Sequence, residues 1–130
     1  MKLILFRTIL SLIFLASLLP AQAASVRVVD GDTIVINGET IRIANIDTPE
    51  TRRARCANER NLGLIATNRV RDLLAGAEIG ISRGDPLDGR LYDKYGRTLA
   101  VISVNGRDLG EILVAEGLAR RWPDGPEFWC

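Results

Sequence analysis

The sequence of 130 residues predicts one small α+β domain, mainly β, with about five strands and two helices. Three observations indicate this fold class. Short runs rich in Val and Ile are separated by Asn-Gly and other turn signals, two segments have the apolar spacing of amphipathic helices, and no repeat or low-complexity segment is present. A five-stranded barrel with a helix between its third and fourth strands accommodates these elements in this order.

The N-terminal residues predict a secretory signal peptide. A basic start is followed by an apolar run at 8–19 and by small residues at 20–23. The uncharged run of about 12 residues is shorter than the roughly 17 to 25 that span a bilayer, so cleavage is favoured over an uncleaved anchor. We place the signal peptide at residues 1–23, with cleavage after Ala23 or Ala24.

The mature domain would comprise residues 24–130 and would be nearly neutral. The chain has 17 basic and 16 acidic residues, and cleavage removes Lys2 and Arg7, which leaves 15 basic residues against the same 16 acidic ones. No overall positive field would draw such a domain to nucleic acid, so phosphate binding must be local. We expect an exported monomer, periplasmic or secreted, without stable membrane association. The clustered arginines, which either contact a substrate or form a solvated surface, are Arg52, Arg53, Arg55, Arg60, Arg120 and Arg121.

The first β elements predict a hairpin. Residues 26–36 and 40–46 alternate apolar and polar side chains, and Asn37-Gly38 between them favours a two-residue turn. This pairing would place Asp32 and Arg42 on adjacent strands. A glycine interrupts the first strand beside Asp32, which indicates either a bulge that turns its carboxylate outward or a plain turn.

The middle of the chain predicts a long helix and two strands. Apolar residues recur at helical spacing over 57–75, and the glycine that follows favours termination there. Residues 77–82 and 97–104 are apolar and partly β-branched, which predicts strands, whereas the Gly, Asp and Pro residues of 83–95 predict an irregular loop.

The C-terminal part predicts a turn, a short helix and an irregular tail. Asn105-Gly106 favours the turn, and Asp108 with Glu111 three positions later is typical of a helix start, with the end near Gly117. Residues 119–130 contain prolines, a glycine and large aromatic side chains, which predicts an irregular segment that packs on the body of the domain.

The two cysteines predict a disulfide bond. An exported chain meets an oxidising compartment, where an even number of cysteines usually pairs, so we expect a bond between Cys56 and Cys130. This bond would join the segment after residue 50 to the end of the chain.

Three carboxylates offer oxygen ligands to a hard divalent cation: Asp32, Asp47 and Glu50. The chain has no histidine and only two cysteines, which disfavours a zinc site and any His-dependent base or triad. With a main-chain carbonyl and waters, the carboxylates would form an open site that leaves room for a substrate phosphate. Calcium is favoured over magnesium because it tolerates irregular geometry and ligands that are distant in sequence.

Two arginines complete a set suited to phosphodiester chemistry. Arg42 lies five positions before Asp47, Arg97 lies beyond the long helix, and each guanidinium can hold phosphate oxygens by paired hydrogen bonds. Pro49 stiffens the segment between Asp47 and Glu50, which would preorganise both carboxylates. Taken alone, this segment is also typical of a helix start.

Four motifs resemble, in this order, those of the staphylococcal nuclease (thermonuclease) family: residues 30–33, 42–50, 93–97 and 99–100. The resemblance extends over roughly residues 26–119. It implies a five-stranded OB-type barrel with about two to three helices, so that residues 24–130 would form one thermonuclease-like domain. It also implies a calcium-dependent nuclease that cuts DNA and RNA to 3′-phosphate products.

The resemblance implies a role for each residue of the site. Asp32 and Asp47 would bind calcium together with the main-chain carbonyl of Thr48, and Glu50 would orient or deprotonate the attacking water. Arg42 and Arg97 would stabilise the charge that grows on the phosphate, with Arg97 the better placed to assist the leaving oxygen.

The chain departs from the best-known members of that family in its substrate-binding residues. Those members are strongly basic and have lysine-rich loops and paired tyrosines near the C-terminus. Here Lys94 and Tyr95 are the candidate substrate contacts, and Trp122 or Trp129 can stack on a base, although burial of the tryptophan in the core is favoured.

Two other functions are consistent with the sequence. One is a non-catalytic OB-fold module that binds nucleic acid or another anion in the cell envelope. The other is a disulfide-linked envelope protein with a structural metal. Both carboxylate and arginine sets are complete, which favours the nuclease.

Overall fold

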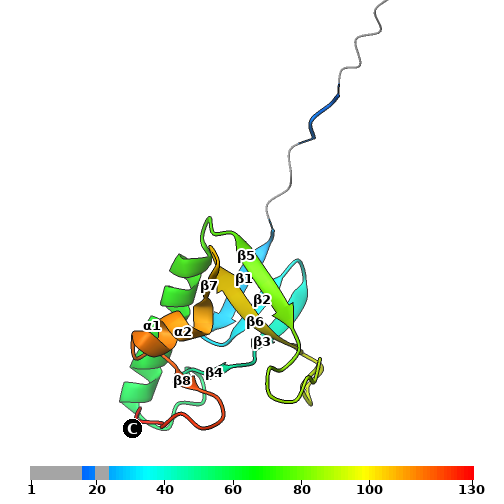
Figure 1. The fold of residues 1–130 in the computed structure, drawn as a ribbon. Coiled ribbons are helices and arrows are strands. Elements are labelled where there is room, and N and C mark those ends of the chain that lie inside the picture. The colour runs from blue at the N-terminus through cyan, green and yellow to red at the C-terminus, as the bar shows by residue number, and fades with distance from the viewer. Residues whose placement is uncertain (1–15, 20–23) are drawn as a thin grey trace, which may run out of the picture.

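The computed structural model describes residues 16–19 and 24–130. The expected signal peptide lies largely outside the described residues. Within the described part of the chain, no helix is both long and apolar enough to cross a membrane. From residue 26 onwards the chain forms a curved sheet with two helices on one side (Figure 1).

One mixed sheet of six strands forms the body of the domain. Its strands are β1 (Val26–Asp30), β2 (Thr33–Ile36), β3 (Glu39–Ile43), β5 (Ile79–Arg83), β6 (Thr98–Val104) and β7 (Arg107–Asp108). The order is β1-β2-β3-β6-β5, with β7 against β6, and every pair is antiparallel except β3 with β6. Without the two-residue β7, these are the five strands expected of the OB-type barrel, and the long helix follows the third of them as predicted.

The segment 26–36 is two strands, and the expectation of a single interrupted strand is wrong. β1 and β2 pair with each other across a tight turn at Gly31-Asp32, so the plain-turn interpretation is right. A bulge is present as well, because the register shifts between Val28 and Asp30. The turn leaves Asp30 and Asp32 together at one end of the sheet.

The predicted hairpin between β2 and β3 is confirmed. Asn37 and Gly38 have φ values of 49° and 82°, the left-handed conformation that a two-residue turn of this type requires. The turn sets the register in which Thr33 faces Arg42. Asp32, which precedes Thr33, therefore lies beside Arg42.

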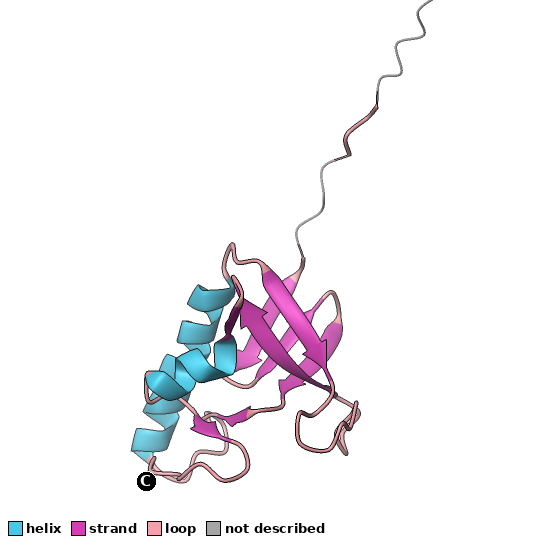
Figure 2. Ribbon diagram, in the orientation of Figure 1, coloured by secondary structure: helices cyan, strands magenta, loops and turns pink. Residues whose placement is uncertain are grey.

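Two helices, α1 (Ala57–Leu74) and α2 (Leu109–Ala115), pack on the same side of the sheet (Figure 2). Both agree with the predicted helices, and the side chain of Asp108 accepts a hydrogen bond from the backbone N–H of Glu111 at 3.1 Å. The N-cap of α1 is Cys56. Residues 47–50 therefore do not start a helix: Asp47 ends a short strand, and residues 48–50 lie in the segment before α1.

The core between the sheet and the helices is aliphatic. Side chains from several strands and from both helices have no exposed surface, among them Ile34, Ile41, Ile102 and Val70. Burial of such side chains stabilises the fold by about 1.5 to 3 kcal/mol each. This packing fixes the ends of β2, β3 and β6, where the candidate site lies.

The C-terminal segment packs on the body as expected, but part of it is regular. β8 (Arg120–Arg121) pairs with β4 (Ile46–Asp47), and Arg120 lies opposite Asp47. Two residues are too few to show a strand pattern in the sequence. The disulfide between Cys56 and Cys130 is confirmed, with the two Cα atoms 6.0 Å apart.

Candidate active site

The separated motifs meet at one end of the sheet. Arg42 on β3 pairs with Thr33 of β2 on one side and with Leu99 of β6 on the other. Asp32 immediately precedes Thr33, and Arg97 immediately precedes β6. The strand register therefore places an acidic and a basic side chain next to Arg42.

These residues line a groove of about 590 Å³. The predicted site side chains that it contains are Asp32, Arg42, Asp47, Glu50, Tyr95 and Arg97. Lys94 lies in an adjoining hollow of about 250 Å³, to which Arg42, Tyr95 and Arg97 also contribute. All predicted metal, catalytic and substrate-contacting side chains thus lie in or beside one depression, except that of Thr48, which is buried.

The arginine clusters divide into two groups. Arg52 and Arg53 are exposed and line the groove, and in the part of the chain that the structure describes they form no salt bridge. The others have protein partners: Arg55 contacts Glu59 and Glu127, Arg60 contacts the carbonyl of Thr51, Arg120 contacts Asp47, and Arg121 contacts Glu111. Arg52 and Arg53 can therefore meet a substrate in the groove without losing an ion pair.

Arg42 lies between two of the site carboxylates. Its Nη2 atom is 3.3 Å from Asp32 Oδ2 and 3.7 Å from Asp47 Oδ1. Nη1 donates to the carbonyl of Ile46 at 2.9 Å and to that of Ile43. The guanidinium is therefore held by backbone and carboxylates together, at the centre of the acidic cluster.

Asp47 has a second cationic partner, Arg120, which sequence reasoning left unassigned. Arg120 Nε donates to Asp47 Oδ2 at 3.0 Å, and its Nη1 donates to the carbonyl of Gly125 at 3.0 Å. The two residues are 73 positions apart and are brought together by the pairing of β4 with β8. No local signal in the sequence indicates this contact.

Asp32 is fixed by a close approach of two backbone segments. The backbone N–H of Thr48 donates to Asp32 Oδ2 at 3.1 Å, and Thr48 itself is only 2% exposed. A Cβ atom on Gly31 would lie 2.8 Å from Thr48 Oγ1, so only glycine allows this approach. The glycine that appears in the sequence as a strand interruption thus joins the first motif to the second.

Burial and the charge of neighbouring carboxylates raise the pKa of Asp30, Asp47 and Glu50. Burial and the neighbouring charge of Asp32 raise the pKa of Asp30 to about 7. Burial raises the pKa of Asp47, and the hydrogen bond from Arg120 opposes this. Desolvation by the groove walls, followed by repulsion from Asp32 and Asp47, raises the pKa of Glu50. Such crowding of carboxylates is typical of a site that binds positive charge.

Arg97 is held by Asp93, a partner that was not predicted from the sequence. Asp93 Oδ2 accepts from Arg97 Nε at 2.6 Å, and Oδ1 accepts from the backbone N–H of Arg97 at 2.9 Å. Burial tends to raise the pKa of Asp93, but these hydrogen bonds keep it below its usual value. The ring of Tyr95, which is 70% exposed, lies 5.4 Å from Arg97 Cζ and 5.1 Å from Lys94 Nζ.

The donor set fits a hard cation held by two carboxylates. Asp32 and Asp47 already share one positive group, the Arg42 guanidinium, between them. Glu50 does not join them, because among residues 16–19 and 24–130 no three acidic, cysteine or histidine side chains are close enough to hold a metal. A metal site formed by all three carboxylates is therefore not present in the described residues. Asp32, Asp47 and the main chain at Thr48 remain the candidate metal ligands.

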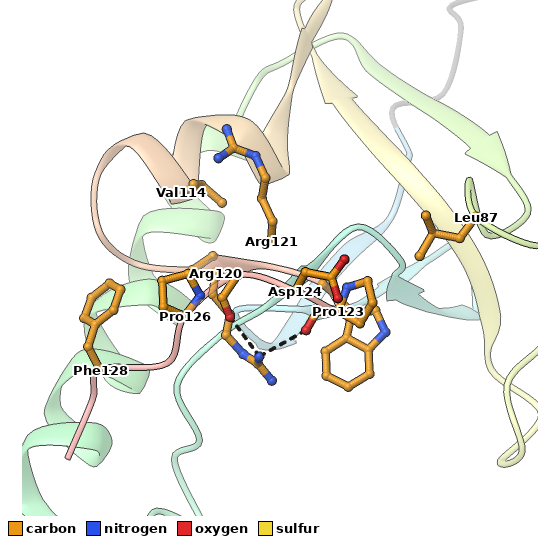
Figure 3. Close-up of a pocket in the computed structure, with 11 residues that line it drawn as sticks. Leu87, Val114, Arg120, Arg121, Pro123, Asp124, Pro126 and Phe128 are labelled. Atoms are coloured by element: carbon orange, nitrogen blue, oxygen red, sulfur yellow. Dashed lines mark hydrogen bonds between the residues drawn. The ribbon is translucent and has the colours of Figure 1, made fainter.

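A second groove, of about 530 Å³, lies beside the C-terminal tail (Figure 3). Figure 3 shows Pro126 and Phe128 towards one end and Leu87 towards the other, with Arg120 directed at the tail backbone. The lining contains one carboxylate, that of Asp124, and no crowded acidic cluster. Its surface is largely apolar, so the chemistry predicted from the motifs belongs to the first groove.

The two tryptophans have different environments. Trp129 is 2% exposed, which agrees with the favoured core role. Trp122 is 44% exposed and borders both the second groove and the hollow that contains Lys94. The expectation of a buried role is therefore wrong for Trp122, because the chain leaves β8 just before it and carries its ring away from the core.

The chain is similar to nucleases. The profile of the family described as staphylococcal nuclease homologue matches residues 40–126. SPbeta prophage-derived endonuclease YokF of Bacillus subtilis (strain 168) is 40% identical over 98 residues, which cover 72% of this chain and 32% of that protein. Endonuclease YncB of the same organism is 39% identical over 98 residues, 72% of this chain and 44% of that protein.

A thermonuclease is also among the relatives. The thermonuclease of Staphylococcus intermedius is 35% identical over 98 residues, which cover 72% of this chain and 55% of that protein. The chain thus matches between about a third and just over half of the length of these relatives.

Proposed function

Because the chain belongs to the staphylococcal nuclease family, we propose that it hydrolyses phosphodiester bonds of DNA, RNA or both, leaving 3′-phosphate products. Relatives named endonuclease and thermonuclease support a nucleic-acid substrate. The observation that carries the proposal is the meeting of Asp32, Asp47, Glu50, Arg42 and Arg97 in one groove.

Glu50 orients or deprotonates the attacking water in this proposal. Its side chain is exposed in the groove and can reach a solvent molecule. Desolvation and the neighbouring carboxylates raise its pKa, which makes it a stronger base than an ordinary carboxylate. No histidine is available for this task.

Arg42 and Arg97 hold the phosphate and stabilise the charge of the pentacoordinate transition state. Asp93 accepts a hydrogen bond from Nε–H of Arg97 and thereby fixes the guanidinium. The Nη groups do not take part in this hydrogen bond, and Nη1 lies 3.5 Å from Thr33 Oγ1. A fixed guanidinium loses little entropy on binding phosphate. Arg97 is the better candidate for assisting the leaving oxygen.

Calcium is the proposed metal ion, with magnesium the less suited, and its ligands are Asp32, Asp47 and the main-chain carbonyl of Thr48. When bound, calcium would neutralise phosphate charge and acidify a water molecule. The chain's own part is to hold the two carboxylates in place. The Thr48 N–H does this for Asp32, and Arg120 does it for Asp47.

The proposed substrate contacts outside the reacting phosphate are Lys94 and Tyr95, together with Arg52 and Arg53. Exposed arginines bind phosphates, and the exposed Tyr95 ring can pack on a base. We further propose that the domain is exported as a monomer and acts outside the cytoplasm, periplasmic or secreted, without stable membrane association.

Two substitutions test the assignment of the chemistry. In calcium, Glu50→Gln is expected to lower the rate of single-stranded DNA cleavage about 10²- to 10⁴-fold, because it removes a general base. Arg97→Ala is expected to lower it about 10²- to 10³-fold, because it removes charge stabilisation in the transition state.

Matched controls remove the same chemical groups from exposed positions away from the groove. Glu78→Gln and Arg71→Ala should cleave like the wild type. If all variants cleave at the wild-type rate, the groove is not the active site. If the wild type binds DNA in calcium without cleaving it, the chain is a binding module and the proposal is wrong.

A further inference from the structure

A buried carboxylate outside the groove holds the backbone of the candidate base. Glu59 lies in the first turn of α1 and is only 1% exposed. Its Oε2 accepts from the backbone N–H of Glu50 at 3.1 Å, and its Oε1 accepts from the backbone N–H of Arg55 at 2.9 Å. A charged side chain is rarely buried to this degree unless it is paired or hydrogen-bonded.

The two hydrogen bonds hold both ends of one loop. This loop, residues 50–55, contains Glu50 and the exposed Arg52 and Arg53, and all three side chains line the groove. Glu59 thus fixes the first and the last residue of the segment that forms one groove wall.

The backbone of α1 also packs against this part of the chain. Gly63 lies one turn after Glu59, and a Cβ atom there would be 2.7 Å from the carbonyl oxygen of Glu50 and 2.8 Å from that of Pro49. Only glycine lets the helix approach this closely. The N–H of Glu50 is therefore bound to Glu59, while its carbonyl lies against the helix backbone.

The C-terminal tail covers Glu59. Cys130 Sγ lies 3.9 Å from Glu59 Oε1, the carbonyl of the buried Trp129 accepts from Asn58 Nδ2 at 2.8 Å, and Glu127 forms an ion pair with Arg55. Burial raises the pKa of Glu59, but the N–H groups of Arg55 and Glu50 and the Arg55 side chain hold it below its usual value. The charged form therefore accepts both hydrogen bonds.

We propose that Glu59 is a positioning residue for the reaction: it fixes the 50–55 loop and thereby sets where the Glu50 carboxylate lies. The proposal rests on the function proposed above for Glu50. Glu59 itself is buried and touches neither solvent nor substrate, so it acts only through the backbone that it holds.

Amide hydrogen exchange tests, without any substrate, whether Glu59 fixes the 50–55 loop. In the wild type, the amides of Glu50 and Arg55 should exchange more slowly than those of Arg52 and Arg53, which lie between them. In Glu59→Gln, only one carbonyl oxygen remains to accept, so at least one of the two amides should exchange about 10-fold faster relative to core amides. Equal exchange across the loop in the wild type would overturn the proposal, even if the variant fails to fold.

Steady-state kinetics separate positioning from stability. At a temperature where each variant is folded, Glu59→Gln should lower kcat about 10- to 100-fold, with KM for single-stranded DNA nearly unchanged. Val70→Ala, a control that weakens the core through the same helix, should lower the melting temperature and keep kcat. A Glu59→Gln variant with the wild-type kcat would overturn the proposal. If the wild type does not cleave nucleic acid, the proposed function fails, and the exchange rates still decide whether Glu59 fixes the loop.

Discussion

Within the groove, Asp32 and Asp47 have different hydrogen-bond and ion-pair partners. Asp32 accepts the Thr48 N–H and contacts Arg42, whereas Asp47 contacts Arg42 and Arg120. Burial of the acids raises pKa values, and the guanidinium groups oppose that effect. Arg120 and Arg42 therefore offset part of the rise that burial causes in the pKa of Asp47.

Removal of Arg120 should weaken calcium binding most strongly at acidic pH. Its hydrogen bond lowers the pKa of Asp47, so Arg120→Ala should raise that pKa further and leave less of the carboxylate ionised. Because a protonated Asp47 cannot hold a cation, the acid limb of calcium binding should move to higher pH. Calcium titration from pH 5 to pH 8 measures this shift.

The control for the calcium titration is Arg121, which follows Arg120 in β8. Arg121 pairs with Glu111 and not with Asp47, so Arg121→Ala should leave the acid limb unchanged. An identical pH profile for Arg120→Ala and the wild type would contradict the role assigned to Arg120.

At the scale of elements, charged side chains tie together strands that carry the site. Glu39 of β3 accepts from Arg83 of β5 through both oxygens, at 2.5 and 2.7 Å, and from Thr98 Oγ1 of β6 at 2.7 Å. These three strands are neighbours in the sheet, and β6 begins directly after Arg97. The Glu39 carboxylate thus joins the strand that carries Arg42 to the strand that follows Arg97.

Glu39 should make stability depend on pH. The hydrogen bonds from Arg83 and Thr98 lower its pKa from 4.5 to about 2. Because the pKa of Glu39 is lower in the folded than in the unfolded state, its ionisation stabilises the folded state at pH values above the unfolded-state pKa. This contribution is lost as the pH falls from about 4.5 through about 2. Glu39→Gln should therefore unfold at lower denaturant concentration than the wild type at pH 6.

Urea unfolding at a series of pH values checks this expectation. The difference between Glu39→Gln and the wild type should shrink as the pH falls below 4.5, while the exposed control Glu78→Gln should show little difference at any pH. A constant difference between pH 6 and pH 2 would show that the loss is not due to ionisation of Glu39.

The disulfide bond should contribute strongly to stability, because it closes a long loop. It joins the N-cap of α1 to the last residue over a sequence separation of 74. Cross-linking a loop of this length removes conformations from the unfolded chain, and the usual contribution is about 2 to 4 kcal/mol. The double variant Cys56→Ser with Cys130→Ser should lose about this much free energy of unfolding.

The same loss should follow chemical reduction of the wild type. Unfolding curves with and without reductant should differ for the wild type and coincide for the double variant. Equal curves for oxidised and reduced wild type would mean that the bond adds nothing to the fold.

For the whole molecule, the sequence predicts the elements that have strong local patterns. The 3.6-residue period of α1, the Asn-Gly turn between β2 and β3 and the Asp108 cap of α2 are short-range features, and each lies where the sequence predicts it. The resemblance to a family added their arrangement and the roles of the motif residues.

The remaining features depend on contacts between distant segments. The pairing of β4 with β8 joins Asp47 to Arg120, and the packing of α1 against the loop brings Glu59 to the backbone N–H of Glu50. The turn at Gly31-Asp32 is decided by the pairing of β1 with β2, which the composition of residues 26–36 does not reveal. In each case the partner is set by packing of the whole domain rather than by spacing along the chain.

The central claim is that this groove performs calcium-dependent phosphodiester hydrolysis. The most direct measurement is cleavage of a short end-labelled single-stranded DNA by the purified wild type, in calcium and in excess chelator, with the new ends identified. We predict cleavage in calcium with 3′-phosphate ends, and none in chelator. Cleavage that is equal in calcium and chelator, or no cleavage in either, would contradict the account.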